Sequence, residues 1–268
     1  MAYFLFNSMK GFMDFKLCGF VFLVMAQNSF ALTGIDIFKT VEADHPTVCK
    51  IEIKRSDSQV SYCTGTLVGN KTIYTAAHCF TRNFSQFDNP VNVTCGGKLM
   101  GKASQVDMPA SDLWINDQTP NLTEDFAVLT LMFKTKITPN AVATGPGLYF
   151  DAKGATLPGV HCSMLGFGQT DIDGPIKIGT LIQSNLEHVR VSISPIQLLA
   201  ILPLEGEPLL RTSVGEGDSG GPLFCQAPGH DSELLGVIDE KWFAVDDPTQ
   251  KPMRNILNAV WMHPDMTN

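Results

Sequence analysis

Three residues far apart in the sequence carry side chains that can act together in nucleophilic catalysis. His78 follows two alanines in the β-rich run YTAAHCF, and Asp125 stands where the acidic stretch NLTED meets the apolar run FAVLTL. Ser219 lies in the glycine-rich turn GEGDSGGP at residues 215–222. Alone, His78 and Asp125 are more typical of structural positions than of catalytic ones. Their order with the serine, His, Asp and Ser, is one of the known orders of a catalytic triad, so the combination favours catalysis.

The turn around Ser219 holds four glycines within eight residues. Glycine is costly in regular elements because it loses more backbone freedom on folding than other residues do. An ordinary surface turn would account for two of these glycines. All four together indicate a stretch that brings backbone N–H groups close to a bound atom and presents one side chain on a tight turn.

The elements that must position these residues are mainly strands. Short runs rich in Val, Ile, Thr and Phe are bounded by Gly, Pro, Asn and Asp, as in VCKIEI, GTLVG, FAVLTLMF, VHCSMLGFG and LLGVIDE. This distribution predicts an all-β barrel or sandwich. Helix is expected at 194–202 and at the C-terminal stretch 254–262. The Gly- and Pro-rich segment 138–159 is the expected division between an N-terminal unit at 32–150 and a C-terminal unit at 151–268.

The composition excludes some partners. The chain has 268 residues, of which 44% are hydrophobic and 17% charged, as in an ordinary globular protein. The formal net charge is −8, and no run of Lys and Arg reverses it locally. Nucleic acid is therefore not an expected partner.

The N-terminus has the pattern of an export signal. Lys10 and Lys16 precede or flank the short apolar run LCGFVFLVMA, which is followed by polar residues and a small residue at Ala31. That run is shorter than the roughly 20 apolar residues of a membrane-spanning helix. The alternative is a buried N-terminal helix. We expect a signal peptide at 1–31, a mature chain that is secreted or periplasmic, and no stable membrane anchor after signal removal.

Cysteine usage agrees with export. Six cysteines follow the predicted signal, and an even number in an oxidising compartment indicates disulfides, although the sequence alone permits 15 pairings. The chain has no C-x-x-C motif, which makes a cysteine metal cluster improbable. Neither a metal nor another cofactor is expected.

The motifs TAAHC, DFAVL and GDSGGP together resemble those of the chymotrypsin/trypsin family of serine endopeptidases. The resemblance extends from about Cys49 to Trp261. It implies two antiparallel six-stranded β-barrels with the active site in the cleft between them. It also implies the disulfides Cys63–Cys79 and Cys162–Cys225, which leaves Cys49 and Cys95 as a third pair.

The resemblance assigns a role to each candidate residue. Ser219 is the nucleophile, His78 the general base and acid, and Asp125 the group that orients the imidazole. The backbone N–H groups of Gly217 and Ser219 would form the oxyanion hole. Asp218 would lie buried behind the turn.

Specificity and activation depart from the family pattern. Ser213 stands at the base of the expected specificity pocket, where trypsin-like members have an aspartate. We therefore expect cleavage after apolar or aromatic residues rather than after Arg. On the following strand the usual small or aromatic residues are replaced by three charged ones, Asp239, Glu240 and Lys241. A carboxylate from this strand that points into the pocket would instead attract a basic side chain of the substrate.

Activation in this family uses a new apolar N-terminus that pairs with the aspartate before the serine, Asp218 here. The usual Ile-Val-Gly-Gly segment is missing. Leu32 directly follows the predicted signal, so its α-amino group is one candidate partner for Asp218. The alternatives are a frayed terminus and an Asp218 held by local hydrogen bonds or by a partner.

The function expected is a secreted serine endopeptidase that acts on protein or peptide substrates, with a protein inhibitor as a further candidate partner. One alternative is a non-catalytic binding module on a protease fold. Another is an esterase that uses the same triad. The segment GDSGG meets the G-x-S-x-G pattern of α/β-hydrolases, but their order Ser, Asp, His is absent.

Overall fold

The structure of the protein is a computed structural model. It describes residues 33–34, 37–40, 42–55, 59–85, 90–108, 125–143, 145–168, 181–186, 189–193, 198–203, 212–213, 217–244 and 255–261. For the strand residues at 33–39, 189–213, 239–244 and 255–261 only the backbone is described.

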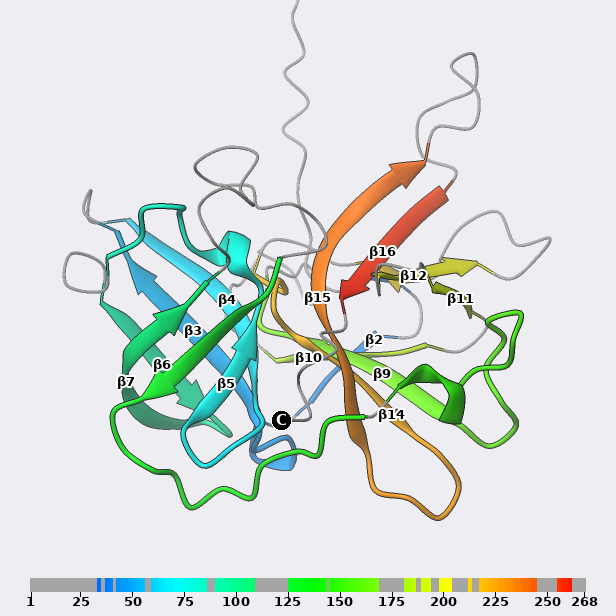
Figure 1. The fold of residues 1–268 in the computed structure, drawn as a ribbon, viewed down its shortest axis with the longest axis horizontal. Coiled ribbons are helices and arrows are strands. Elements are labelled where there is room, and N and C mark those ends of the chain that lie inside the picture. Colours follow the sequence, from blue (N-terminus) through cyan, green and yellow to red (C-terminus); the bar gives the residue numbers. More distant parts are fainter. Residues whose placement is uncertain are drawn as a thin grey trace, which may run out of the picture.

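The first half of the molecule is a closed β-barrel with the strand order β3-β4-β5-β8-β7-β6 (Figure 1, blue to green). Every neighbouring pair in it is antiparallel. Buried and less buried residues alternate along β6 and β8, because successive side chains of a strand point to opposite faces. The strands are β3 (Val48–Lys54), β4 (Val60–Leu67), β5 (Thr72–Thr75), β6 (Val91–Cys95), β7 (Lys98–Asp107) and β8 (Ala127–Leu131).

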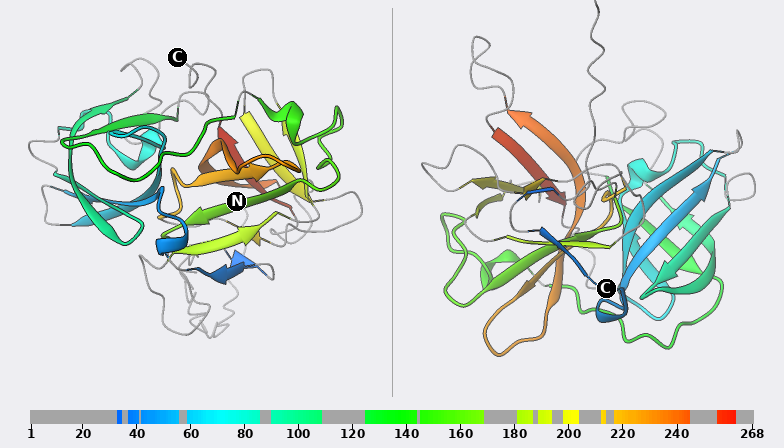
Figure 2. Two further views of the ribbon diagram at one scale, coloured as in Figure 1. Left: turned by 90° about the horizontal axis from the view of Figure 1, so that it is seen from below. Right: turned by 180° about the vertical axis from the view of Figure 1, so that it is seen from behind.

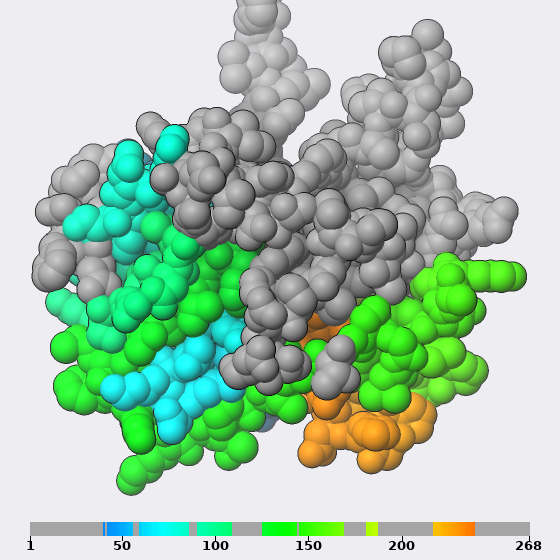
Figure 3. All heavy atoms as spheres, viewed as in Figure 1, coloured from blue at the N-terminus to red at the C-terminus, as the bar shows by residue number. Residues whose placement is uncertain are grey.

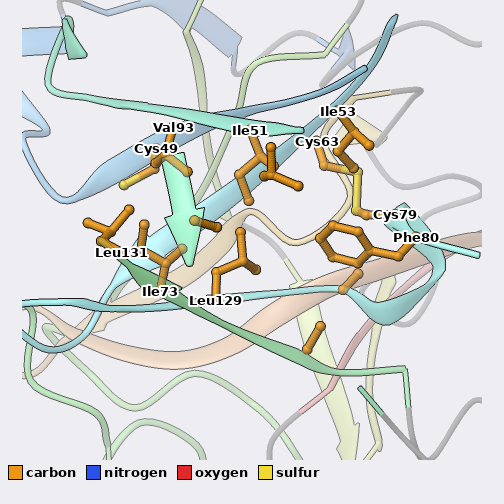
Figure 4. Close-up of a cluster of buried hydrophobic side chains, with 14 of the residues drawn as sticks. Cys49, Ile51, Ile53, Cys63, Ile73, Cys79, Phe80, Val93, Leu129 and Leu131 are labelled. Carbon is orange, nitrogen blue, oxygen red and sulfur yellow. A yellow bond between two sulfur atoms is a disulfide. The ribbon is translucent and has the colours of Figure 1, made fainter. Parts of the chain in front are cut away.

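Aliphatic side chains fill the interior of this barrel. Ile51, Ile73, Leu129 and Leu131 are fully buried and come from β3, β5 and β8 (Figure 4). Phe80 lies at one end of the cluster beside the Cys63–Cys79 disulfide. The barrel core therefore includes Cys79 and Phe80, the two residues that directly follow His78.

The second half is an antiparallel sheet of eight strands in the order β11-β12-β16-β15-β14-β9-β10-β2 (Figures 1 and 2). The space-filling view shows the β14–β15 hairpin in orange beside the first barrel (Figure 3). A closed second barrel is not seen among the described strands and stays a prediction. The strands are β2 (Ile37–Lys39), β9 (His161–Gly166), β10 (Ile182–Asn185), β11 (Val189–Ile193), β12 (Leu198–Pro203), β14 (Pro222–Gln226), β15 (Glu233–Ala244) and β16 (Asn255–Trp261).

The N-terminal strands belong with the second half. β2 pairs with β10, and β1 (Thr33–Gly34) pairs with β13 (Thr212–Ser213), with Thr33 opposite Ser213. Both strands precede the first barrel in sequence, but β2 is an edge strand of the eight-stranded sheet, and β1 forms a separate two-stranded sheet with β13. The predicted division of the chain at 150/151 stays a prediction.

The two predicted helices are wrong. The C-terminal stretch forms β16, which pairs with both β12 and β15, and the stretch at 194–202 contributes to β12. Hydrogen bonds to a strand on each edge satisfy the backbone N–H and C=O groups of β16, and this pairing overrides a weak local preference for helix. The described helices are single 3₁₀ turns, and none is long or apolar enough to cross a membrane: η1 (Glu42–Asp44), η2 (Ala77–Cys79) and η5 (Pro146–Leu148).

The three expected disulfides are confirmed. Two of them join residues directly opposite each other on neighbouring strands, β3 with β6 and β9 with β14. The third joins β4 to η2, next to the histidine. The pairs are Cys49–Cys95, Cys162–Cys225 and Cys63–Cys79.

Candidate active site

Strand pairing in the first barrel brings His78 and Asp125 together. Thr75 at the end of β5 lies opposite Ala127 at the start of β8. The residues just after β5 and just before β8 therefore meet at the same end of the barrel. Asp125 Oδ2 lies 2.5 Å from His78 Nδ1, and Asp125 Oδ1 accepts a hydrogen bond of 2.7 Å from the His78 backbone N–H. Asp125 is almost fully buried, whereas the His78 side chain is 27% exposed.

Ser219 lies in a turn at residues 217–220 that is held from both halves of the molecule. Its carbonyl accepts a 2.9 Å hydrogen bond from the backbone N–H of Thr64 in β4. The next residue, Gly220, donates to the carbonyl of Ile238 in β15 at 2.7 Å. Cys79, the neighbour of His78, places its Sγ 3.8 Å from the Ser219 carbonyl oxygen. The serine turn and the histidine segment are therefore in direct contact.

The glycines of this turn are required by close approach and backbone conformation. Gly220 has φ +80°, and a Cβ there would lie 2.0 Å from Thr75 Oγ1 and 2.3 Å from the Thr64 carbonyl oxygen. Gly217 has φ +95°, and a Cβ there would lie 2.8 Å from Gly168 Cα. Side chains rarely adopt such φ values, and neither position has room for one.

Asp218 is fully buried behind the turn. Its Oδ1 accepts a 3.0 Å hydrogen bond from the Gly168 N–H, just beyond β9. A Cβ at Gly166 would lie 1.9 Å from the same oxygen, so the glycine makes room for the carboxylate. Leu32, its predicted partner, lies outside the described residues.

A comparison with protein families identifies the family to which the chain belongs. The family profile described as Trypsin matches residues 35–252. The chain belongs to the trypsin family. Membership in the trypsin family supports a serine peptidase of the hydrolase class.

Three similar proteins share 25–29% of their aligned residues with the chain. The chain is 29% identical to mast cell protease 2 of Meriones unguiculatus over 191 residues, which is 67% of this chain and 71% of that protein. It is 25% identical to the chymase of Papio hamadryas over 203 residues, 73% of this chain and 78% of the relative. It is 28% identical to mast cell protease 8 of Mus musculus over 211 residues, 76% and 81% of the two chains.

The predicted specificity residues are described by their backbone alone. Ser213 lies in β13, opposite Thr33. Asp239, Glu240 and Lys241 lie in β15, where the pairing with β16 shifts between Ile238 and Lys241. Their roles in this trypsin-family member stay predictions.

A groove of about 760 Å³ lies away from the triad residues, lined by residues of both halves. His45 and His161 are on its wall, whereas His78, Asp125 and Ser219 are not. Burial lowers the pKa of His45, and the nearby Asp44 opposes that effect. The groove is therefore not part of the candidate active site.

Within the described part of the chain, no group of three His, Cys, Asp or Glu side chains is placed to hold a metal ion.

One residue of the site was missed by the sequence analysis. Thr64, in the CTGTLV run of β4, is fully buried and touches the serine turn through both its backbone and its hydroxyl. Only its position after Cys63 pointed toward the site.

Proposed function

We propose that this chain is an exported serine endopeptidase that hydrolyses peptide bonds through Ser219, His78 and Asp125. The double contact between His78 and Asp125, beside the turn that presents Ser219, is the observation that carries the proposal. Membership in the trypsin family supports the same reaction class.

Each residue has a defined part in the proposed reaction. The Ser219 Oγ attacks the carbonyl carbon of the scissile bond while His78 Nε2 takes its proton. His78 then gives that proton to the leaving amine nitrogen, the C–N bond breaks and an acyl-enzyme remains. Water attacks the acyl group, again with proton transfer to His78, and the returned proton restores the Ser219 hydroxyl.

Asp125 holds the imidazole for this task. Its contact with Nδ1 fixes the proton on that nitrogen and leaves Nε2 free to accept. The buried carboxylate also stabilises the imidazolium that forms during attack.

The oxyanion that develops on the substrate would be held by the backbone N–H groups of Gly217 and Ser219. A donor of this kind contributes about 3 kcal/mol of transition-state stabilisation. The positive φ of Gly217 supports this role, because it is a conformation in which a side chain would be strained.

Export and activation belong to the same proposal. Residues 1–31 act as a signal peptide, and its removal leaves Leu32 as the new N-terminus. The pairing of Thr33 with Ser213 supports docking of this terminus against the C-terminal half of the chain. The Leu32 ammonium would then pair with the Asp218 carboxylate, in addition to the hydrogen bond that the carboxylate accepts from the Gly168 N–H.

Primary specificity follows from the pocket base. Ser213 carries no charge, so the pocket would take apolar or aromatic side chains better than Arg. An inward-facing Asp239 or Glu240 would reverse this preference.

The test is cleavage of a peptide library by the purified chain that begins at Leu32, read by mass spectrometry. The proposal predicts internal cleavage, mainly after Phe, Tyr or Leu, and no cleavage by Ser219→Ala. Hydrolysis of esters without any peptide cleavage would favour the esterase alternative. Tight binding of peptides without turnover would favour the binding module.

A further inference from the structure

Thr64 is a fully buried residue of β4 whose hydroxyl lies at the junction of the barrel, the end of β9 and the serine turn. We infer that Thr64 is a positioning residue that sets the oxyanion turn of this enzyme through its hydroxyl group. The inference rests on the proposed function, because it assigns Thr64 to the machinery that the Gly217 and Ser219 N–H groups would form.

Both hydrogen-bonding capacities of the Thr64 hydroxyl are used within the site. Oγ1 donates to the carbonyl oxygen of Gly217 at 2.8 Å and accepts from the backbone N–H of Phe167 at 2.9 Å. The residues that it joins are 153 and 103 positions away in sequence. The hydroxyl therefore links the first barrel to the strand end and to the turn.

The backbone of Thr64 holds the same turn at a second point. Its N–H donates to the Ser219 carbonyl at 2.9 Å, and its own carbonyl accepts from Thr75 Oγ1 at 2.7 Å. The Asp218 carbonyl between these points accepts from the Gly221 N–H at 2.8 Å. Each of the three successive carbonyls of the turn thus has a partner, and Thr64 supplies two of them.

These contacts restrain where the Ser219 N–H, one of the two proposed oxyanion donors, points. A peptide unit is planar, so fixing a carbonyl also fixes the N–H of the next residue. The Thr64 contacts fix the units before and after the one that carries the Ser219 N–H. Gly217 has no side chain to restrict its rotation, so the hydroxyl bond to its carbonyl restrains its ψ and the peptide unit between Gly217 and Asp218, which directly precedes the unit that carries the Ser219 N–H.

Removal of the hydroxyl should therefore act on the transition state rather than on substrate binding. Thr64→Val keeps the branched shape and loses the hydroxyl, which leaves the Gly217 carbonyl without this donor. Loss of one oxyanion donor costs about 10²- to 10³-fold in kcat, and misorientation should cost part of that, on the order of 10- to 100-fold. KM for a peptide should change by less than about threefold, since uniform binding is not removed.

The chain offers a matched control on the same strand. Thr66 is also a fully buried threonine of β4, and its hydroxyl has no hydrogen-bond partner among the described residues. Thr66→Val should leave kcat within about twofold of the wild type, since it removes no bond to the turn. Thr64→Ser, which keeps a hydroxyl, should restore most of the kcat that Thr64→Val loses.

The experiment measures kcat, KM and the inhibition constant of a peptide aldehyde for these four proteins. The aldehyde adduct places an oxygen at the oxyanion position, so its affinity should fall in Thr64→Val by about the same factor as kcat. Thr64→Ala takes the place of valine if Thr64→Val shows no cooperative unfolding transition.

The outcomes separate the inference from the proposed function. An active wild type with an unchanged kcat in Thr64→Val, or an equal loss in Thr66→Val, would overturn the inference alone. A loss confined to KM would also overturn it and leave Thr64 a structural link. A folded wild type that cleaves no peptide and binds no aldehyde would overturn both.

Discussion

Asp125 contacts His78 through both carboxylate oxygens. Oδ2 lies 2.5 Å from the imidazole Nδ1, and Oδ1 accepts the backbone N–H of His78 at 2.7 Å. The carboxylate thus fixes the ring and the backbone of the same residue. Because Asp125 is buried, these contacts act in a site with little competing water.

Asp125→Asn should reduce kcat by about 10⁴-fold, the loss known for this change in triads of this type. The asparagine amide would donate to Nδ1 and leave the proton on Nε2, where it blocks general-base action. The measurement is kcat on the best peptide substrate, with circular dichroism to establish an unchanged fold. A folded variant within tenfold of the wild type would rule out this role for Asp125.

Gly220→Ala should destabilise the protein far more than Gly229→Ala. Both glycines have similar φ values, +80° and +77°, but a Cβ at Gly229 meets nothing within 4 Å. Gly229→Ala should cost about 1–2 kcal/mol from backbone strain alone. At Gly220 the added Cβ would also overlap the Thr64 carbonyl and Thr75 Oγ1, so we expect at least about 2 kcal/mol more. Urea unfolding of the two variants measures the difference, and equal costs would contradict the packing of the turn.

Two disulfides of the first barrel should differ in what they support. Cys49–Cys95 closes 46 residues inside the barrel, whereas Cys63–Cys79 closes 16 and lies against the serine turn. Replacing the first pair by alanines should cost up to about 4 kcal/mol of stability and leave kcat nearly unchanged at 25 °C. Replacing the second pair should cost up to about 3 kcal/mol and also lower kcat. Equal kcat in the two double variants would mean that the Cys79 contact with Ser219 has no catalytic consequence.

The N-terminus should matter if the Leu32 ammonium pairs with Asp218. A chain that begins at Leu32 should be active, and one that begins with an added Met before Leu32 should lose most of its kcat. N-terminal sequencing of the secreted protein checks that cleavage follows Ala31. Full activity of the extended chain would mean that activity does not need an ion pair between the Leu32 ammonium and Asp218. The Asp218 carboxylate accepts a hydrogen bond from the Gly168 N–H in either case.

Short motifs account for what could be predicted from the sequence. The contact of His78 with Asp125 and the pairing of the three disulfides were predicted from the family resemblance that these motifs carry, because residue types and spacing alone leave 15 pairings open. The helix expected at 254–262 was wrong because its backbone partners are β12 and β15, which local preference does not reveal. The pocket residues Ser213 and Asp239 were found by position in the family pattern, and their side-chain environment remains a prediction.

Thr64 shows more clearly what sequence patterns cannot predict. Its sequence neighbourhood, between a disulfide cysteine and a glycine of β4, is that of an ordinary buried strand. Its hydroxyl is hydrogen-bonded to the Phe167 N–H and the Gly217 carbonyl. These residues are distant in the sequence and come close to Thr64 only where the two halves of the molecule pack together. A role that depends on long-range hydrogen bonds of one hydroxyl leaves no periodic signal in the sequence.

The central claim is that Ser219 is the nucleophile and His78 its base, and the most direct test is to locate a fluorophosphonate adduct by mass spectrometry. The wild-type chain should be labelled at Ser219 alone. Labelling should vanish in Ser219→Ala and be slowed by orders of magnitude in His78→Ala, because a neutral hydroxyl without its base is a poor nucleophile. An adduct on another serine, or peptide cleavage at the wild-type rate by Ser219→Ala, would contradict the account.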